Sequence, residues 1–232
     1  MHPLERTTAD QVVAILKNVL LRMNLNIQHA GGQCYDEAVT MAGKKTVVAT
    51  QIKTINGKCL YMHCYVHAFN LAIADAIKSV QCISDSLDTV REIRKLVKKS
   101  PQRHTKLDKI RAETKNESPG VHAFCPTRWT VRSEALAAVI NNHTELLELW
   151  DWLLTMSKDT EMKARIRGVQ SMMTTFNFYF GCTLGEQLLR QTDNLSGALQ
   201  DSSTTAAQGN RLAQDVVKTL LKDRTHTSFS LF

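Results

Sequence analysis

A regular hydrophobic spacing in the second half of the chain constrains the fold more than any other feature. Two consecutive stretches each carry six positions separated by four, three, four, three and four residues. The positions are Leu136, Ile140, His143, Leu147, Trp150 and Leu154, then Met162, Ile166, Val169, Met173, Phe176 and Phe180. Such spacing lines up side chains on one face of a helix. It predicts two long amphipathic helices packed side by side, within an all-helical region over 130–223.

The first 80 residues show a different pattern, in which short strands alternate with helices. Thr8 and the glutamine three residues later form a potential capping box, and apolar residues at helical spacing follow, so a helix is expected over 8–23. Short strands are expected within 25–36, which contains a glycine pair, and over 59–67. A helix should follow over 68–80. The chain is therefore expected to join an α/β region to an all-α region.

The positive charge is concentrated in one segment. Residues 91–115 contain ten Lys and Arg against three Asp and Glu, which equals the net charge of +7 of the whole chain. An apolar stripe runs along the same segment, formed by Leu87, Val90, Ile93 and Val97. The pattern predicts either a solvated helix face or a surface that attracts a polyanion such as nucleic acid. The candidate contacts are Arg91, Arg94, Lys95, Lys98, Lys99 and Arg103.

Residues 100–127 are polar and contain three prolines, which predicts a long loop. Six cysteines without a Cys-x2-Cys pair predict reduced thiols. The first residues lack the apolar segment of a secretory signal, and no stretch approaches the roughly 18 apolar residues of a membrane span. We therefore expect a soluble cytosolic or nuclear protein without a membrane partner, and the sequence leaves its oligomeric state open.

Three blocks of the sequence carry a family resemblance. They are GGQCYDEAVTMAGKKTVVATQIK (31–53), LYMHCYVHAFNLAIADA (60–76) and CPTRWTVRSEAL (125–136). In this order and at these intervals they resemble the catalytic region of hAT-type DNA transposases. The resemblance is strongest to domesticated relatives among the zinc-finger MYM-type proteins, with a DUF4371-type RNase H-like domain.

The resemblance implies an RNase H-like α/β core with few strands, interrupted by a long helical insertion, in a mostly helical chain. It implies an RNase H-like remnant over 1–80 and a basic helix with a long loop, ending in an Arg-Trp motif, over 81–129. A truncated helical insertion should occupy 130–232. Family members carry their first catalytic aspartate upstream of these blocks and their catalytic glutamate after the insertion. The chain is therefore expected to be a central fragment, and the nucleus is its favoured location.

Asp36 matches the second catalytic aspartate of the family, one ligand of a two-Mg²⁺ site for phosphoryl transfer. A single carboxylate does not hold two metal ions, and Glu37 stands where the family usually has glycine. We therefore expect a vestigial match, no enzyme activity and no cofactor, with Mg²⁺ entering only if an intact site were completed. Glu134, Glu145 and Glu148 match no catalytic position and are expected to be exposed helix charges.

Cys64 and His67 match the Cys-x2-His pair of the family and are expected to be structural. His122 and Cys125 repeat the spacing in mirror order, and together the four side chains are of the types that bind zinc. Because 54 residues separate the two pairs, a bound metal is not expected.

Arg128 and Trp129 match the Arg-Trp motif, which the resemblance places near DNA. A guanidinium binds phosphate and an indole stacks on an unstacked base. The expected function is that of a transposase-derived, catalytically inactive domain that binds nucleic acid or protein. Two alternatives stay open. One is a fragment of an active metal-dependent transposase, and the other is a helical protein-interaction module without DNA affinity.

Overall fold

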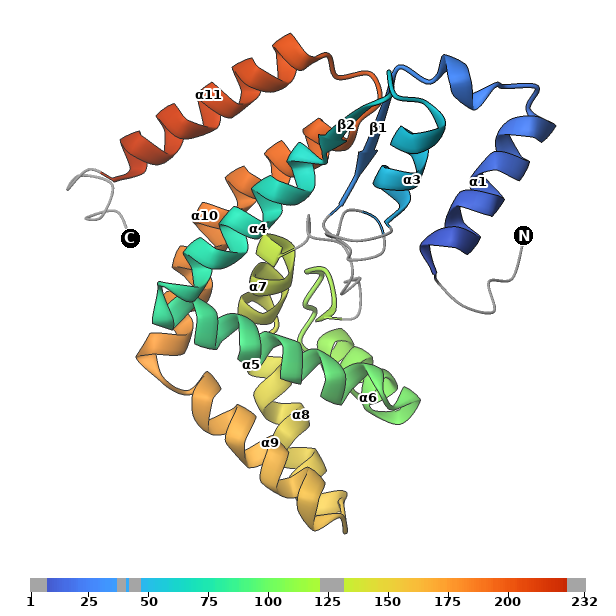
Figure 1. Ribbon diagram of the computed structural model, residues 1–232. Coiled ribbons are helices and arrows are strands. Elements are labelled where there is room, and N and C mark those ends of the chain that lie inside the picture. The colour runs from blue at the N-terminus through green and yellow to red at the C-terminus, as the bar shows by residue number, and fades with distance from the viewer. Residues whose placement is uncertain (1–7, 37–40, 42–46, 122–131, 225–232) are drawn as a thin grey trace. The chain divides into compact units, whose positions relative to one another are not determined.

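The computed structural model describes residues 8–36, 41, 47–121 and 132–224 (Figure 1). The chain divides into two compact units, unit 1 over residues 1–72 and unit 2 over residues 73–232. The described residues form ten α-helices, one 3-10 turn and a two-stranded parallel sheet. The prediction of a mostly helical chain with a small α/β part is therefore confirmed.

Unit 1 contains the two strands. β1 (Gly32–Tyr35) pairs in parallel with β2 (Leu60–His63), and α3 (Val48–Ile55) lies between them in the sequence, in the crossover that a parallel pair requires. Helix α1 (Ala9–Arg22) precedes β1, and α4 (Tyr65–Lys78) follows β2 and continues into unit 2. Both predicted strands exist. The second is shorter than expected because α4 already begins at Tyr65.

A single asparagine organises the turn before β1. The Nδ2 atom of Asn56, at the C-cap of α3, lies 3.0, 3.2 and 3.0 Å from the carbonyl oxygens of Ile27, Gln28 and Ala30. The residues Ile27–His29 form a 3-10 turn. The sequence pattern predicts that this segment belongs to the first strand. The long-range hydrogen bonds of Asn56 stabilise it as a turn instead.

The core of unit 1 is small. It consists of Val13 from α1, Val48 and Ile52 from α3, and Cys59. Thr8 occupies the N-cap of α1, but its side chain makes no capping hydrogen bond, so the predicted capping box is wrong. The amphipathic pattern alone located this helix correctly, because it is packing of the apolar face that stabilises most helices in proteins.

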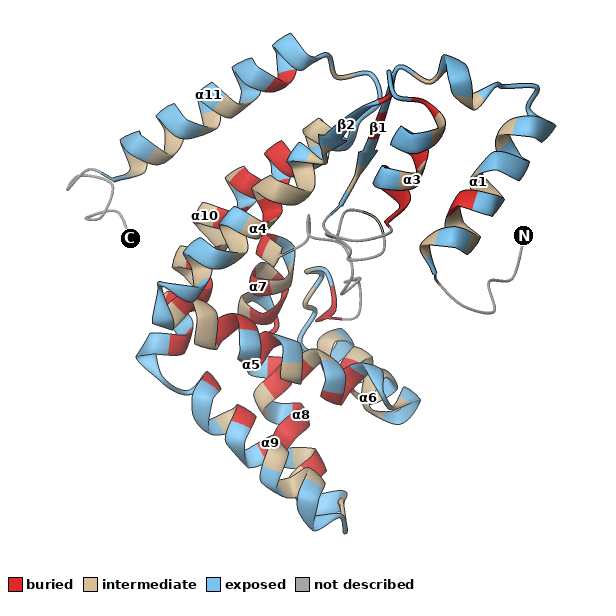
Figure 2. Cartoon of the chain, in the orientation of Figure 1, coloured by how far each residue is buried: buried red, intermediate tan, exposed pale blue. Residues whose placement is uncertain are grey.

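Unit 2 is built from helices around one apolar core (Figure 2). They are α5 (Gln81–Lys98), α6 (Pro101–Glu113), α7 (Arg132–Asn141), α8 (His143–Met156), α9 (Thr160–Met173) and α10 (Phe176–Gln200). Helix α11 (Ala206–Asp223) packs against α10 and contributes no residue to this core. Trp150, Ile93, Leu136 and Ile166 are among its fully buried side chains. The predicted all-helical region is confirmed for the described residues from 132 on. None of the described helices is long and apolar enough to cross a lipid bilayer.

The two long helices predicted from the hydrophobic spacing are each broken once. Asn142 separates α7 from α8, where its Nδ2 atom donates to the carbonyl oxygens of Ala138 (2.7 Å) and Pro119 (3.0 Å). Thr175 caps the start of α10, with its Oγ1 accepting from the backbone N–H of Phe178 (3.2 Å). The apolar spacing continues across both breaks, so the pattern by itself does not reveal them.

The predicted loop over 100–127 is wrong for its first half, which forms α6. Pro101 stands in the first turn of this helix, where a missing N–H costs no intrahelical bond. Leu107 and Ile110 are buried in the core of unit 2 and hold α6 against it. Two apolar positions in a polar segment are too few to predict a helix from the sequence. The segment forms a helix because these two side chains are buried in the core.

Helix α10 packs against α5 and α7. At the α7 end, the buried Asp193 accepts hydrogen bonds through Oδ2 from the backbone N and the Oγ of Ser133, both at 2.9 Å. Burial raises the pKa of Asp193, although the bonds from Ser133 and the charge of Arg132 oppose this rise. The carboxyl group thereby binds backbone N–H at the start of α7, where the helix dipole favours a negative charge.

Candidate nucleic-acid interface

Helix α5 presents two chemically different faces. Leu87, Val90, Ile93 and Val97 are buried in the core, as the apolar stripe predicts. The opposite face carries Arg91, Lys95, Lys98 and Lys99, all exposed. Burial of the stripe orients the helix, and the 3.6-residue period then directs these cations to the surface.

The exposed cations of α5 differ in how far they are neutralised. Arg91 pairs with Asp88 one turn earlier, and the Nζ of Lys95 lies 3.5 Å from Glu92. Exposed pairs of this kind contribute little to stability and are easily exchanged for another anion. The side chains of Lys98 and Lys99 form no hydrogen bond or ion pair with any described residue. The uncompensated charge therefore concentrates at the C-terminal end of α5.

The two remaining candidate arginines are partly buried. Arg94 is half-buried, and its Nη2 atom is enclosed without a hydrogen-bond partner among the described residues. Arg103, in the first turns of α6, donates through Nη1 to the carbonyl oxygen of Leu96. Burial lowers the pKa of Arg103, the charge of Arg165 lowers it further, and Asp159 opposes both. Arg103 is therefore held in place, whereas the α5 lysines are free to move.

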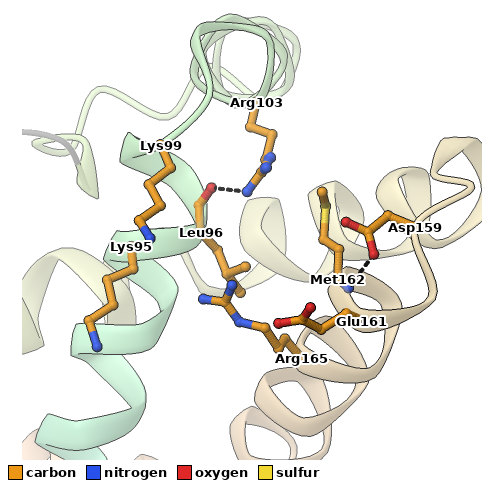
Figure 3. A pocket seen from close by; sticks show the side chains of 8 residues that line it. All are labelled: Lys95, Leu96, Lys99, Arg103, Asp159, Glu161, Met162 and Arg165. Carbon is orange, nitrogen blue, oxygen red and sulfur yellow. Dashed lines mark hydrogen bonds between the residues drawn. The ribbon is translucent and has the colours of Figure 1, made fainter.

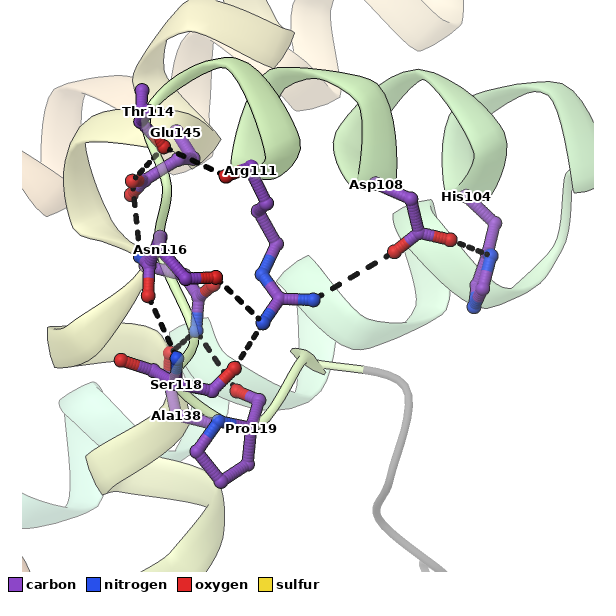
Figure 4. Close-up of polar contacts among 10 residues, drawn as sticks. His104, Asp108, Arg111, Thr114, Asn116, Ser118, Pro119, Ala138 and Glu145 are labelled. Atoms are coloured by element: carbon purple, nitrogen blue, oxygen red, sulfur yellow. Dashed lines mark hydrogen bonds and ion pairs between the residues drawn. The ribbon is translucent and has the colours of Figure 1, made fainter.

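A polar network ties the end of α6 to the rest of unit 2 (Figure 4). Arg111 donates to the carbonyl oxygens of Asn116 and Ser118 and lies 3.8 Å from Asp108. Glu145 on α8 accepts from Thr114 Oγ1 (2.8 Å) and Asn116 Nδ2 (2.9 Å). Glu145 is buried, so the expectation that it is an exposed helix charge is wrong. This network connects the C-terminal end of α6 and the segment after it to α8.

Replacing Glu145 with glutamine is expected to make the free energy of unfolding less dependent on pH in the acidic range. Burial alone would raise the pKa of Glu145, but bonds from Asn116 and Thr114 and the charge of Arg111 outweigh it and lower the pKa. A lowered pKa stabilises the fold above the unfolded value of about 4.3, and this contribution is lost as the pH falls through the folded pKa. At pH 7 the variant should lose about 1 kcal/mol.

Chemical denaturation at pH 7 and at pH 3 measures this difference. Glu148→Gln is the matched control, because Glu148 lies on the same helix and is exposed. An equal loss for Glu145→Gln at both pH values would show that the carboxylate charge has no part in the network.

Asp36 directly follows β1 and is exposed, as expected for the end of a strand. The preceding Tyr35 accepts a hydrogen bond through its carbonyl oxygen from the backbone N of Cys64 (2.9 Å), which keeps the two strand ends together. No group of three or more His, Cys, Asp or Glu among the described residues could hold a metal ion. The described residues around Asp36 therefore do not provide the converging carboxylates that a two-Mg²⁺ site requires.

Cys64 and His67 have different neighbours. The rings of His67 and His63 stack at 6.3 Å between centroids. Cys34 on β1 has its pKa raised by burial and then by the charge and hydrogen bond of Cys64, so the two thiols face each other. The Cys64 thiol thus lies beside β1, and the His67 ring lies beside the last residue of β2.

Several predicted residues lie outside the described part of the chain: Glu37, His122, Cys125, Arg128 and Trp129. His143 is described, and its Nε2 lies 3.0 Å from the carbonyl oxygen of Met173. The residue is half-buried, and its ring is hydrogen-bonded. The residue begins α8, however, and does not lie in the middle of a continuous helix.

Comparison with known proteins locates this surface within a recognised domain type. Residues 62–173 match the family model of the ZBED1 RNase-like helical domain, just under half of the chain. The match extends from β2 to the end of α9 and therefore includes the basic face of α5. It supports a transposase-derived domain of the hAT/ZBED type. No solved structure matches the chain.

Proposed function

We propose that this transposase-derived helical domain, similar to that of ZBED1, binds the phosphate backbone of nucleic acid through the basic face of α5. The observation that carries the proposal is the uncompensated charge of Lys98 and Lys99, beside the weakly paired Arg91 and Lys95. Flexible surface cations bind a polyanion by releasing its condensed counterions. We also propose that the chain is related to the domesticated zinc-finger MYM-type proteins and that β1 and β2 belong to an RNase H-like core. The proposed location is the nucleus.

The chemistry of this face favours binding without sequence preference. Residues 91–115 contain no Phe, Tyr or Trp on which an unstacked base could stack. Lysine presents a mobile point charge, which suits phosphate and carries no base-edge readout. We further propose that the domain has no catalytic activity, because Asp36 is the one position that matches a catalytic residue of the family.

Loss of the α5 lysines is expected to weaken DNA binding and its salt dependence. The test variant combines Lys95→Ala, Lys98→Ala and Lys99→Ala, and it leaves out the half-buried Arg94 to spare the fold. Each lost phosphate contact lowers the slope of log K against log salt by about 0.9, so the slope should fall by up to about 2.7. At physiological salt the affinity should fall by on the order of 100-fold.

Binding of a labelled DNA duplex, titrated at several salt concentrations, measures both effects. The control variant combines Lys53→Ala, Lys58→Ala and Lys218→Ala, which removes the same charge from exposed positions elsewhere. Equal losses in both variants would assign the binding to net charge and refute a specific basic face. Cleavage of the duplex in Mg²⁺ that disappears in Asp36→Ala would instead establish an active transposase fragment.

Helix α11 favours a second candidate function, protein interaction. Leu212, Val217 and Leu221 are exposed on this helix, and its one buried residue is Gly209. Val217 and Leu221, four residues apart, share one face of the helix, an arrangement typical of helices that dock into a partner. A wild-type chain without DNA affinity in the titration above would favour this function over nucleic-acid binding.

A further inference from the structure

A small polar pocket lies where α5 ends, α6 begins and α9 passes beside them (Figure 3). Its volume is about 120 Å³, enough for a small polyatomic anion. Four cationic and two acidic side chains line it, together with two apolar ones. They are Lys95, Lys99, Arg103, Arg165, Asp159, Glu161, Leu96 and Met162.

The two guanidinium groups of the pocket are held in place by the protein. Arg103 donates through Nη1 to the carbonyl oxygen of Leu96, and Arg165 pairs through Nε (2.9 Å) and Nη2 with Glu92 on α5. Arg165 also contributes to lowering the pKa of Arg103, which means that the two positive charges act on each other. Two like charges fixed in a hollow create a site that a bound anion relieves.

The lysines complete the cationic side of the pocket. Lys99 forms no ion pair with a described residue, and Lys95 has only the 3.5 Å contact with Glu92. Both can turn towards an anion without breaking a strong bond. Figure 3 shows the cationic chains arriving from α5, α6 and α9, so three helices would hold one ligand.

The two acidic residues stand at the start of α9. Asp159 caps this helix, and its Oδ1 accepts from the backbone N of Met162 (3.1 Å). Glu161 is exposed in the first turn. Both carboxylates reduce the positive potential, and so does Glu92, which pairs with Arg165 and Lys95, so that four cations face three carboxylates.

We propose that this pocket binds one phosphate group of a nucleic-acid backbone, with Arg103 and Arg165 as fixed ligands and Lys95 and Lys99 as mobile ones. The inference rests on the proposed function and deepens it, because it adds Arg165 from outside the basic segment. A planar, pre-oriented guanidinium favours phosphate oxygens over a simple halide ion. The pocket therefore anchors the backbone at one point, while the α5 face binds the neighbouring phosphates.

The first test uses inorganic phosphate as the probe. The melting temperature is measured in potassium phosphate and in potassium chloride of equal ionic strength at pH 7. Phosphate should raise it in a saturable manner, because a ligand that binds only the native state stabilises it. Lys99→Gln and Arg165→Gln should each lose at least half of the rise. The matched controls Lys109→Gln and Arg167→Gln, exposed residues that do not line the pocket, should keep it.

The second test asks whether the pocket binds a phosphate group of a nucleic-acid backbone. In the salt titration with DNA, Arg165→Gln should lower the slope by about 0.9 and Arg167→Gln should leave it unchanged. If Arg165→Gln does not fold, the phosphate melting test with Lys99→Gln decides on the pocket, because Lys99 also belongs to the α5 face and its loss lowers the DNA slope under either proposal.

Each outcome bears on one of the two proposals. DNA binding that persists with equal slopes in Arg165→Gln and Arg167→Gln would refute the pocket and leave the α5 interface standing. A phosphate effect in a wild-type chain that does not bind DNA would refute the nucleic-acid partner. If phosphate does not raise the melting temperature of the wild-type chain, the phosphate pocket is refuted and the proposed α5 interface is unaffected.

Discussion

Replacing Gly181 with alanine is expected to destabilise unit 2 by about 3 kcal/mol or more. Gly181 lies where α10 meets α5, and a Cβ atom there would be 2.8 Å from the carbonyl carbon of Cys82 and closer still to its oxygen and to Ser86 Oγ. Backbone atoms cannot turn aside, so the two helices would have to separate. The separation would also strain the bond from Ser86 Oγ to the carbonyl oxygen of Phe178 (3.2 Å).

Gly197→Ala provides the matched control on the same helix. No atom lies within 4 Å of the position that its Cβ would occupy. This substitution should stabilise the chain by roughly 0.5–1 kcal/mol, because alanine loses less backbone entropy in a helix. Urea denaturation followed by circular dichroism compares the two. A neutral Gly181→Ala would mean that α5 and α10 do not pack this closely.

Replacing Trp150 with alanine should cost about 3–5 kcal/mol, the range for removal of a large aromatic side chain from a core. Trp150 is fully buried at the centre of the unit 2 cluster, and its Nε1 donates to the sulfur of Met173 (3.2 Å). The truncation leaves a cavity among side chains from several helices that cannot collapse together. The same denaturation experiment measures the loss.

Trp152→Ala on the same helix should cost clearly less. Trp152 is only half-buried, and Lys106 lies over its ring with its Nζ 5.8 Å from the ring centre. An exposed cation–π contact contributes about 0.5–1 kcal/mol. Equal losses for the two tryptophans would contradict the assignment of Trp150 to the centre of the core.

The candidate site could be predicted in part. Counting charges along the sequence located the basic segment, and the apolar stripe of α5 showed which of its residues face solvent. Neither signal separates Lys98, which has no ion partner among the described residues, from Arg94, whose guanidinium is half-buried. Nothing in the sequence distinguishes Arg165 from Lys163 and Arg167 on the same helix, because its partner Glu92 lies 73 residues away.

The sequence by itself determined the helical character of the second half, the two short strands and the side of α5 that meets the core. These properties depend on the period of apolar residues, which is a local quantity. The tertiary structure decided that α6 is a helix, that Asn142 marks a helix break, and that Glu145 is buried. Each of these depends on a partner far along the chain: the core around Leu107, the carbonyl of Pro119, the side chains of Thr114 and Asn116. A local period is unchanged by such contacts, and the free energy of burying and pairing these groups exists only once the helices have packed.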